Sequence, residues 1–178
     1  NITVGFLGLG YLGSFVAKKL FKMGYKIIGY KNSPPNKKFP FNVYYRKKDL
    51  SKFIKQSEIL VNILPSTQQT NNLINKSFLK KMKKKALLIN VGRGSTIDEK
   101  DLIDHLKKNK KFEASLDVFQ NEPLLKSSPL WKLPNVTITP HVASITVLDT
   151  AVAYIYKKYC YYKKTGKIKS NVNLKKGY

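Results

Sequence analysis

Three short segments of this chain carry side chains suited to acid–base chemistry on a carboxylic acid. They span 88–94, 116–123 and 138–143, and they contribute Arg93, Glu122 and His141. Arginine binds a carboxylate through a planar, bidentate fork, and histidine exchanges a proton near neutral pH. Together the three residues suit a reaction in which a carbonyl oxygen gains a proton while a neighbouring carboxylate is held in register. Taken singly, each also has a structural explanation: a cation at a strand end, a loop carboxylate and a hydrogen-bonded core histidine.

A glycine-rich segment, Gly8-Leu9-Gly10-Tyr11-Leu12-Gly13, follows the apolar run 2–7 and opens an amphipathic stretch. In a dinucleotide fingerprint the first glycine makes a tight turn, the second lets a pyrophosphate approach the backbone, and the third lets helix and strand pack closely. The helix N-terminus then offers free N–H groups and its positive dipole end to phosphate. We interpret the segment as a dinucleotide-binding loop, and the alternative is a merely tight turn between strand and helix.

The end of the second apolar run indicates which dinucleotide binds. NAD-binding versions usually carry an acidic residue there, which accepts hydrogen bonds from the ribose. This chain has Lys31-Asn32-Ser33, with Lys37 and Lys38 close behind, and no carboxylate before Asp49. Such a loop offers cations and hydrogen-bond donors to a 2′-phosphate, so we expect NADP in preference to NAD. NAD stays open, because these lysines also fit the general lysine excess of the chain.

Apolar runs alternate with amphipathic stretches from end to end. We expect strands at 2–7, 26–30, 43–45, 58–63, 86–91, 113–118 and 136–139. We expect helices at 11–23 and 49–55, a helix ending in the lysine run 80–85, a helix at 98–108 capped by Asp98, and a long helix from about 146 to 164. This alternation predicts an α/β fold, a doubly wound, Rossmann-like parallel sheet. Ligands of such sheets bind at the carboxyl ends of the strands, where the three segments above begin.

The composition is strongly basic, with 34 Lys plus Arg against 10 Asp plus Glu and a net charge of +24. Only Arg46 and Arg93 are arginines, and the lysines are scattered, so we expect no specific nucleic-acid function. The single cysteine, Cys160, excludes an internal disulfide, and no Cys or His spacing suggests a metal site. No apolar run approaches the roughly 20 residues that cross a bilayer, so we expect no membrane segment and a cytoplasmic location. His105 lies among lysines and is expected at the surface.

Taken together, these motifs resemble the D-2-hydroxyacid dehydrogenases, and the chain is most similar to the glyoxylate/hydroxypyruvate reductase branch. The resemblance rests on the glycine loop, the loop 64–70, the arginine loop, the segments 130–131 and 134–136, Thr139-Pro140-His141, and the closing Gly177-Tyr178. It implies that Arg93 binds the substrate carboxylate and carbonyl, that His141 is the acid and base, and that Glu122 orients and charges the histidine. The expected cofactor contacts are Gly8, Gly10, Tyr11, Leu12, Gly13, Lys31, Asn32, Leu64, Pro65, Thr70, Val91, Gly92, Arg93, Asp117, His141 and Ala143, with Asp117 at the nicotinamide end.

The resemblance further implies the reduction of a small 2-oxo acid, glyoxylate or hydroxypyruvate, with hydride from NAD(P)H, and a homodimer. Family members carry a substrate lobe ahead of the nucleotide domain, whereas the first strand here begins at Ile2. We therefore expect the lobe to be missing, because the chain is either a piece of a longer one or a truncated product. Residues 1–145 would form the nucleotide domain, and 146–178 a helix and tail that return to the absent lobe. The alternative is an inactive dinucleotide-binding remnant with incidental polyanion binding.

Overall fold

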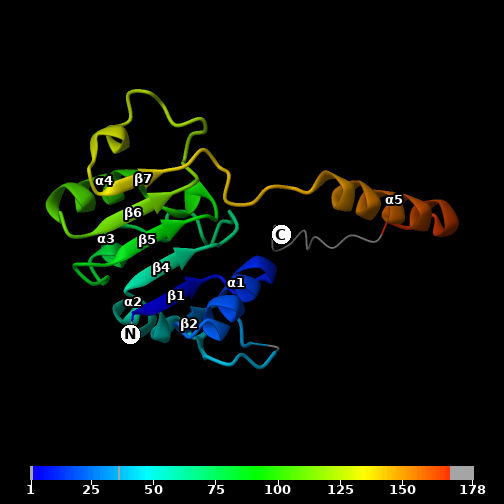
Figure 1. Ribbon diagram of the computed structural model, residues 1–178, viewed down its shortest axis with the longest axis horizontal. Helices are drawn as coiled ribbons and strands as arrows, with labels where there is room; N and C mark the ends of the chain where they lie inside the picture. Colours follow the sequence, from blue (N-terminus) through cyan, green and yellow to red (C-terminus); the bar gives the residue numbers. More distant parts are fainter. Residues whose placement is uncertain (1, 36, 169–178) are drawn as a thin grey trace. The chain divides into compact units, whose positions relative to one another are not determined.

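The computed structural model describes residues 2–35 and 37–168, and its centre is a seven-stranded parallel sheet (Figure 1). The strands are β1 (Thr3–Leu7), β2 (Lys26–Tyr30), β3 (Asn42–Tyr44), β4 (Ile59–Asn62), β5 (Leu87–Asn90), β6 (Glu113–Leu116) and β7 (Val136–Ile138). They lie in the order β3-β2-β1-β4-β5-β6-β7, and every neighbouring pair is parallel. The order reverses between β1 and β4, which is the arrangement of a doubly wound fold. The predicted Rossmann-like sheet is confirmed.

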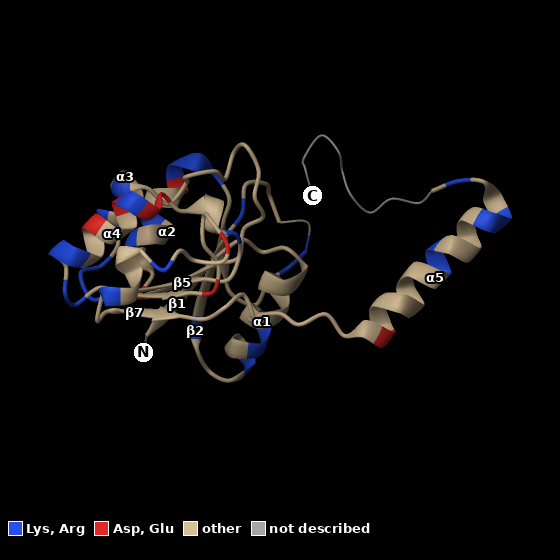
Figure 2. Ribbon diagram, turned by 90° about the horizontal axis from the view of Figure 1, so that it is seen from above, with Lys and Arg blue, Asp and Glu red and all other residues tan. Residues whose placement is uncertain are grey.

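The helices are α1 (Tyr11–Lys22), α2 (Leu50–Gln56), α3 (Lys76–Leu79), α4 (Glu99–Lys108) and α5 (Leu148–Thr165). Short 3-10 turns lie at Lys47–Asp49, Gly94–Thr96 and Pro129–Lys132. Seen from above, α1 lies on one side of the sheet and α2, α3 and α4 lie on the other (Figure 2). Each side has its own apolar core. The smaller one gathers Val4, Phe6 and Ala17 under α1, and the larger one joins the other face of the strands to Phe53, Phe78 and Leu102.

The position of β1 inside the sheet explains why the first apolar run has no polar alternation. All five of its residues are buried, since it pairs with β2 on one side and β4 on the other and is packed on both faces. A strand enclosed in this way reads as a continuous apolar run. Its carboxyl end delivers the chain directly into the glycine loop.

One predicted helix is wrong. The segment before β5 was expected to be helical through the lysine run 80–85, but α3 is a single turn that ends at Leu79. Asn75 caps its start, with its side chain accepting from the N–H groups of Ser77 and Phe78. In a continued helix, lysines three and four residues apart in this run would repel one another, and the chain instead turns back toward β5. By contrast, Asp98 caps α4 as expected, accepting from the Asp101 N–H at 3.0 Å.

One further expectation, about a single residue, is corrected. His105 is half-buried, and its ring packs edge-on against Phe112 at a centroid distance of 4.6 Å. Burial lowers the pKa of its imidazole. The lysines and arginines are spread over several helices and loops and do not gather on one element (Figure 2). None of the described helices is both long and apolar enough to span a membrane, and the described residues hold no cluster of potential metal ligands.

The structure separates two compact units, Asn1–His141 and Val142–Tyr178. The first contains the sheet, and the second contains α5, none of whose described residues is buried. α5 ends at Thr165, and the next residue, Gly166, caps it with a φ of 65°, the left-handed conformation that glycine adopts readily. The expected division at 145 stays a prediction, and Gly177 and Tyr178 lie outside the described residues.

Candidate active site

The glycine loop has the local geometry of a phosphate-binding turn. Gly8 has a φ of 110°, which only glycine adopts readily, and its N–H donates to the Tyr30 carbonyl at 3.0 Å. A Cβ on Gly13 would lie 2.2 Å from the Gly8 carbonyl oxygen, so close packing of α1 on β1 requires glycine there. A Cβ on Gly10 would meet no atom within 4 Å. Gly10 therefore borders open space at the start of α1. This is the position expected of the glycine that lets a pyrophosphate approach the backbone.

The first turn of α1 is open to an anion. Gly10 is its N-cap and provides no side-chain acceptor, and the turn contains no acidic residue. Tyr11 and Leu12 are both exposed. Free N–H groups and the positive end of the helix dipole therefore face outward at this point.

The predicted cofactor-selecting residues follow β2 and stand beside this turn. The Lys31 N–H donates to the Tyr44 carbonyl at 3.1 Å, which extends the pairing of β2 with β3 by one residue. The next residue, Asn32, is exposed, as are Lys37 and Lys38. Since the Gly8 N–H bonds to the last residue of β2, the glycine loop and this basic loop are joined at one edge of the sheet.

The loop after β4 presents Leu64 and Pro65 but keeps Thr70 inside. Thr70 is buried, and its hydroxyl donates to the Pro65 carbonyl at 2.6 Å. The Thr70 hydroxyl oxygen also accepts a hydrogen bond from the Thr67 N–H at 2.9 Å. Thr70 thus shapes the loop from within, whereas Leu64 and Pro65 are partly exposed.

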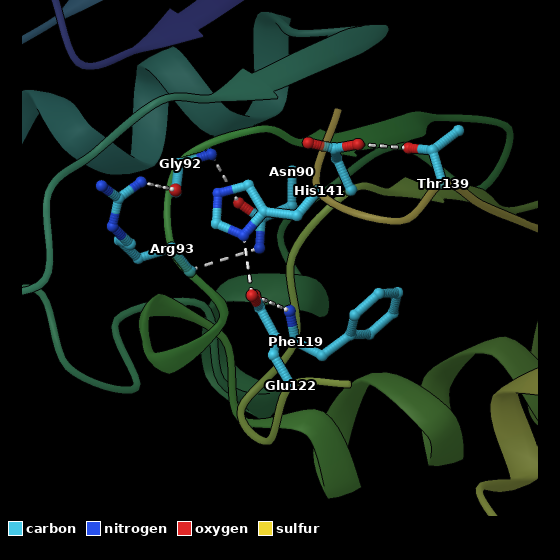
Figure 3. Close-up of polar contacts among 8 residues, drawn as sticks. Asn90, Gly92, Arg93, Phe119, Glu122, Thr139 and His141 are labelled. Carbon is cyan, nitrogen blue, oxygen red and sulfur yellow. Dashed lines mark hydrogen bonds and ion pairs between the residues drawn. The ribbon is translucent and has the colours of Figure 1, made fainter. Parts of the chain in front are cut away.

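Arg93 stands on a loop that two glycines allow to pack tightly. A Cβ on Gly92 would lie 2.6 Å from the Leu64 carbonyl oxygen, and one on Gly94 would lie 1.9 Å from the Phe119 carbonyl. The loops after β4, β5 and β6 are therefore in direct contact. The Arg93 guanidinium donates to the Gly92 carbonyl at 2.7 Å (Figure 3). Its other N–H groups have no hydrogen-bond partner among the residues that the structure describes.

His141 is held in a fixed position by its backbone and by its ring. Its φ is 54°, which is uncommon for a residue other than glycine, and its N–H donates to the Asp117 carbonyl at 2.9 Å. Such conformations cluster at functional sites. The ring Nδ1 lies 2.7 Å from Glu122 Oε2. Figure 3 shows the other ring nitrogen pointing away from Glu122, which leaves it available to a substrate.

Glu122 is fixed at both carboxylate oxygens. Oε1 accepts from the Phe119 N–H at 3.0 Å, and Oε2 binds His141. Partial burial acts to raise the pKa of Glu122, but these two hydrogen bonds outweigh it. The positive charges of His141 and Arg93 contribute in the same direction, so the pKa is below its ordinary value. Glu122 is therefore ionised at neutral pH, and it can orient the imidazole and stabilise its protonated form.

Asp117 is buried at the end of β6, and Val91 and Gly92 follow β5 beside it. One Asp117 carboxylate oxygen accepts from the Thr139 hydroxyl at 2.5 Å. The Asp117 N–H donates to the Asn90 carbonyl at 3.0 Å, which joins the β5 and β6 ends. The first unit thus gathers the predicted residues from Gly8 to His141 on loops at one edge of the sheet. Ala143 belongs to the second unit, and the contacts of all these residues with a cofactor stay predictions.

Three buried polar residues of this region were not anticipated from the sequence. Asn62 and Asn90 end neighbouring strands at the same register, and Thr96 follows the arginine loop. The Asn62 amide donates to Asn90 Oδ1 at 2.8 Å and to Thr96 Oγ1 at 2.7 Å. A signal was present in the sequence, since each of two apolar strands ends in asparagine.

Comparisons with known proteins agree with this geometry. A family model described as the NAD binding domain of D-isomer specific 2-hydroxyacid dehydrogenases matches residues 1–143. A D-isomer specific 2-hydroxyacid dehydrogenase from Xanthobacter autotrophicus, solved with NADPH and MES, is 38% identical with a TM-score of 0.91, covering 99% of this chain and 73% of that one. An NADPH-dependent glyoxylate/hydroxypyruvate reductase from Sinorhizobium meliloti, solved with NADP and sulfate, is 31% identical with a TM-score of 0.90.

A probable 2-hydroxyacid dehydrogenase from Rhizobium etli, solved with NADP, HEPES and tartaric acid, is 30% identical with a TM-score of 0.88. The present chain is covered to 99% in both rhizobial comparisons but spans only 57% of those proteins. The matched part is the nucleotide domain. The chain therefore belongs to the D-isomer specific 2-hydroxyacid dehydrogenases, a family of oxidoreductases that act on CH–OH groups with NAD(P), and corresponds to their NAD-binding domain.

Proposed function

We propose that this chain is the nucleotide domain of a reductase that converts a small 2-oxo acid, glyoxylate or hydroxypyruvate, to the 2-hydroxy acid. The observation that carries the proposal is the 2.7 Å contact between His141 Nδ1 and Glu122 Oε2. Arg93 lies on the adjoining loop and acts electrostatically on Glu122. A proton donor and a carboxylate-binding cation therefore belong to one site.

Each of the three side chains has a distinct part in the proposed reaction. Arg93 binds the substrate carboxylate with N–H groups that the fold leaves available, which fixes the carbonyl relative to His141. His141 gives its proton to the carbonyl oxygen as negative charge develops there. Glu122 keeps the imidazole oriented and stabilises its charged form. The side chains of His141 and Glu122 are 49% and 36% exposed, so the pair is accessible to a substrate.

We further propose that the cofactor is NADP, with NAD as the weaker alternative. The Gly8–Gly13 turn and the first N–H groups of α1 would hold the pyrophosphate. Lys31 and Asn32, with Lys37 and Lys38 nearby, would receive the 2′-phosphate. When bound, the nicotinamide group supplies the hydride. Several related proteins were solved with NADP or NADPH, which supports this preference.

The experiment is a spectrophotometric assay of the full-length gene product. It follows NADPH oxidation at increasing glyoxylate or hydroxypyruvate, with NADH as the comparison cofactor. We expect turnover with NADPH and one or both acids, and a lower kcat/KM with NADH. A protein that binds NADPH but oxidises it with neither acid would be an inactive binding remnant, and a tenfold preference for NADH would overturn the cofactor assignment.

We also propose that the protein acts as a homodimer in the cytoplasm. Apolar side chains exposed on α1 support the proposal, because a second copy of the chain could cover them. Leu12, Phe15 and Val16 are 50%, 57% and 40% exposed. Analytical ultracentrifugation tests the dimer directly. The mass of the sedimenting species should be about twice the 20.4 kDa of one chain. A species of monomer mass throughout the micromolar range would contradict the proposal.

A further inference from the structure

A buried cluster of Asn62, Asn90 and Thr96 lies beneath the arginine loop, and we call it the polar triad. The three residues are 0%, 1% and 0% exposed. Burying polar groups costs free energy unless they form hydrogen bonds, and here they bond mainly to one another and to the loop. Their hydrogen bonds to the main chain of Arg93, the proposed carboxylate-binding residue, indicate a role besides packing.

The direction of the triad's hydrogen bonds follows from chemistry. The Arg93 carbonyl can only accept, so the Thr96 hydroxyl, at 2.5 Å, must donate to it. The same hydroxyl oxygen accepts from the Asn62 amide at 2.7 Å. Asn90 Nδ2 adds a longer contact to the Arg93 carbonyl at 3.4 Å. Two side-chain donors therefore converge on the main chain of Arg93, drawn in part in Figure 3.

The triad also reaches the neighbouring loops. Asn90 Oδ1 accepts from the Gly92 N–H at 3.2 Å, and Asn62 Oδ1 accepts from the Leu64 N–H at 3.4 Å. Asn62 and Asn90 are paired in register across β4 and β5. The cluster thus ties the chain leaving β4 to the chain leaving β5, on either side of the site.

We propose that Asn62, Asn90 and Thr96 are positioning residues, which fix the backbone of Arg93 and so direct its guanidinium toward the substrate carboxylate. Among the described residues, the guanidinium bonds only to the adjacent Gly92 carbonyl. Its place in the site therefore depends on where the backbone carries it. The catalytic consequence rests on the function proposed above, whereas the ordering of the Arg93 backbone does not.

The kinetic test compares three variants of the full-length protein. Thr96→Val keeps the side-chain shape and the Thr96 N–H, which donates to the Arg93 carbonyl at 3.2 Å, but removes the hydroxyl donor. We expect kcat/KM for glyoxylate to fall about 10- to 100-fold. NADPH affinity should stay within about twofold, and Thr96→Ser, which restores the hydroxyl, should stay within about threefold of wild type. Ser57→Ala is the matched control, because Ser57 is equally buried and donates to the Phe53 carbonyl at 2.9 Å. It should cost stability without changing kcat/KM. An equal loss of kcat/KM in Ser57→Ala, or none in Thr96→Val, would overturn the proposal.

A second test does not depend on activity. The chain has only two arginines, Arg46 and Arg93, so selective ¹⁵N-arginine labelling gives two backbone amide signals, which Arg46→Lys assigns. In Thr96→Val we expect the order parameter of Arg93 to fall from about 0.85 toward 0.6, with Arg46 unchanged. An Arg93 amide as rigid as in wild type would refute positioning by the triad. If the wild-type protein reduced neither acid, the proposed function would fail, and this measurement would still decide the positioning claim.

Discussion

Replacing Gly10 by alanine should separate cofactor binding from folding. A Cβ at Gly10 meets no atom within 4 Å, and the backbone has φ −72° and ψ −158°, which alanine can adopt. The substitution reduces the entropy of the unfolded chain, which stabilises the fold by about 0.4–1 kcal/mol. Alanine is a poorer N-cap than glycine by a similar amount. We therefore expect the free energy of unfolding in urea to stay within about 0.5 kcal/mol of wild type.

Binding should respond very differently. The added methyl group would stand in the open space at the start of α1, where the pyrophosphate must approach the helix N–H groups. A hydrogen bond to a charged group contributes about 1.5–3 kcal/mol. Losing two of them would cost about 3–6 kcal/mol, which raises the Kd for NADPH about 10²- to 10⁴-fold. Fluorescence titration of the 178-residue chain with NADPH measures this change.

Gly13→Ala is the matched control, because the added methyl group would clash with the fold and would not face open space. Its Cβ would lie 2.2 Å from the Gly8 carbonyl oxygen, so this variant should lose folding stability before any effect on binding is considered. The reasoning would be refuted if Gly10→Ala bound NADPH as tightly as wild type. It would also be refuted if Gly10→Ala unfolded as readily as Gly13→Ala.

Two further predictions concern pH. The pKa of Glu122 is lowered in the folded chain, so its charge stabilises the fold above the unfolded value of about 4.3, and this contribution is lost as the pH falls through the folded pKa. In urea titrations Glu122→Gln should be less stable than wild type at pH 6, with a difference that shrinks toward pH 3; a constant difference would contradict this. Burial lowers the pKa of His105, so the unfolded chain binds the extra proton, and stability should fall as the pH drops below about 6.5. His105→Leu should flatten the stability profile between pH 7 and pH 5, and an unchanged slope would show that His105 is not its source.

The sequence was sufficient to predict that the candidate site residues gather at one edge of the sheet. Gly8, Arg93 and His141 each follow an apolar strand, and the carboxyl ends of parallel strands share one edge. It could not predict the pairing of Asn62 with Asn90, because their contact depends on strand register, which periodicity leaves open. Nor could it predict that Thr70 is buried, because a loop has no regular period from which a buried side can be inferred.

Charge and apolar spacing were less reliable guides to the helices. The expected helix before β5 ends in the lysine run 80–85, whereas α3 ends at Leu79, before that run. His105 was placed at the surface because of its lysine neighbours, whereas the fold packs its ring against Phe112. The first error comes from repulsion among the lysines, and the second from a ring contact only seven residues along the chain, neither of which apolar spacing reveals.

The central claim is that His141, held by Glu122, is the proton donor of a 2-oxo acid reductase. The most direct measurement compares wild type with His141→Gln in the full-length protein, following NADPH oxidation with glyoxylate and with hydroxypyruvate while NADPH binding is titrated separately. We predict a fall in kcat of about 10²- to 10⁴-fold with the Kd for NADPH unchanged. Undiminished turnover in His141→Gln would contradict the account.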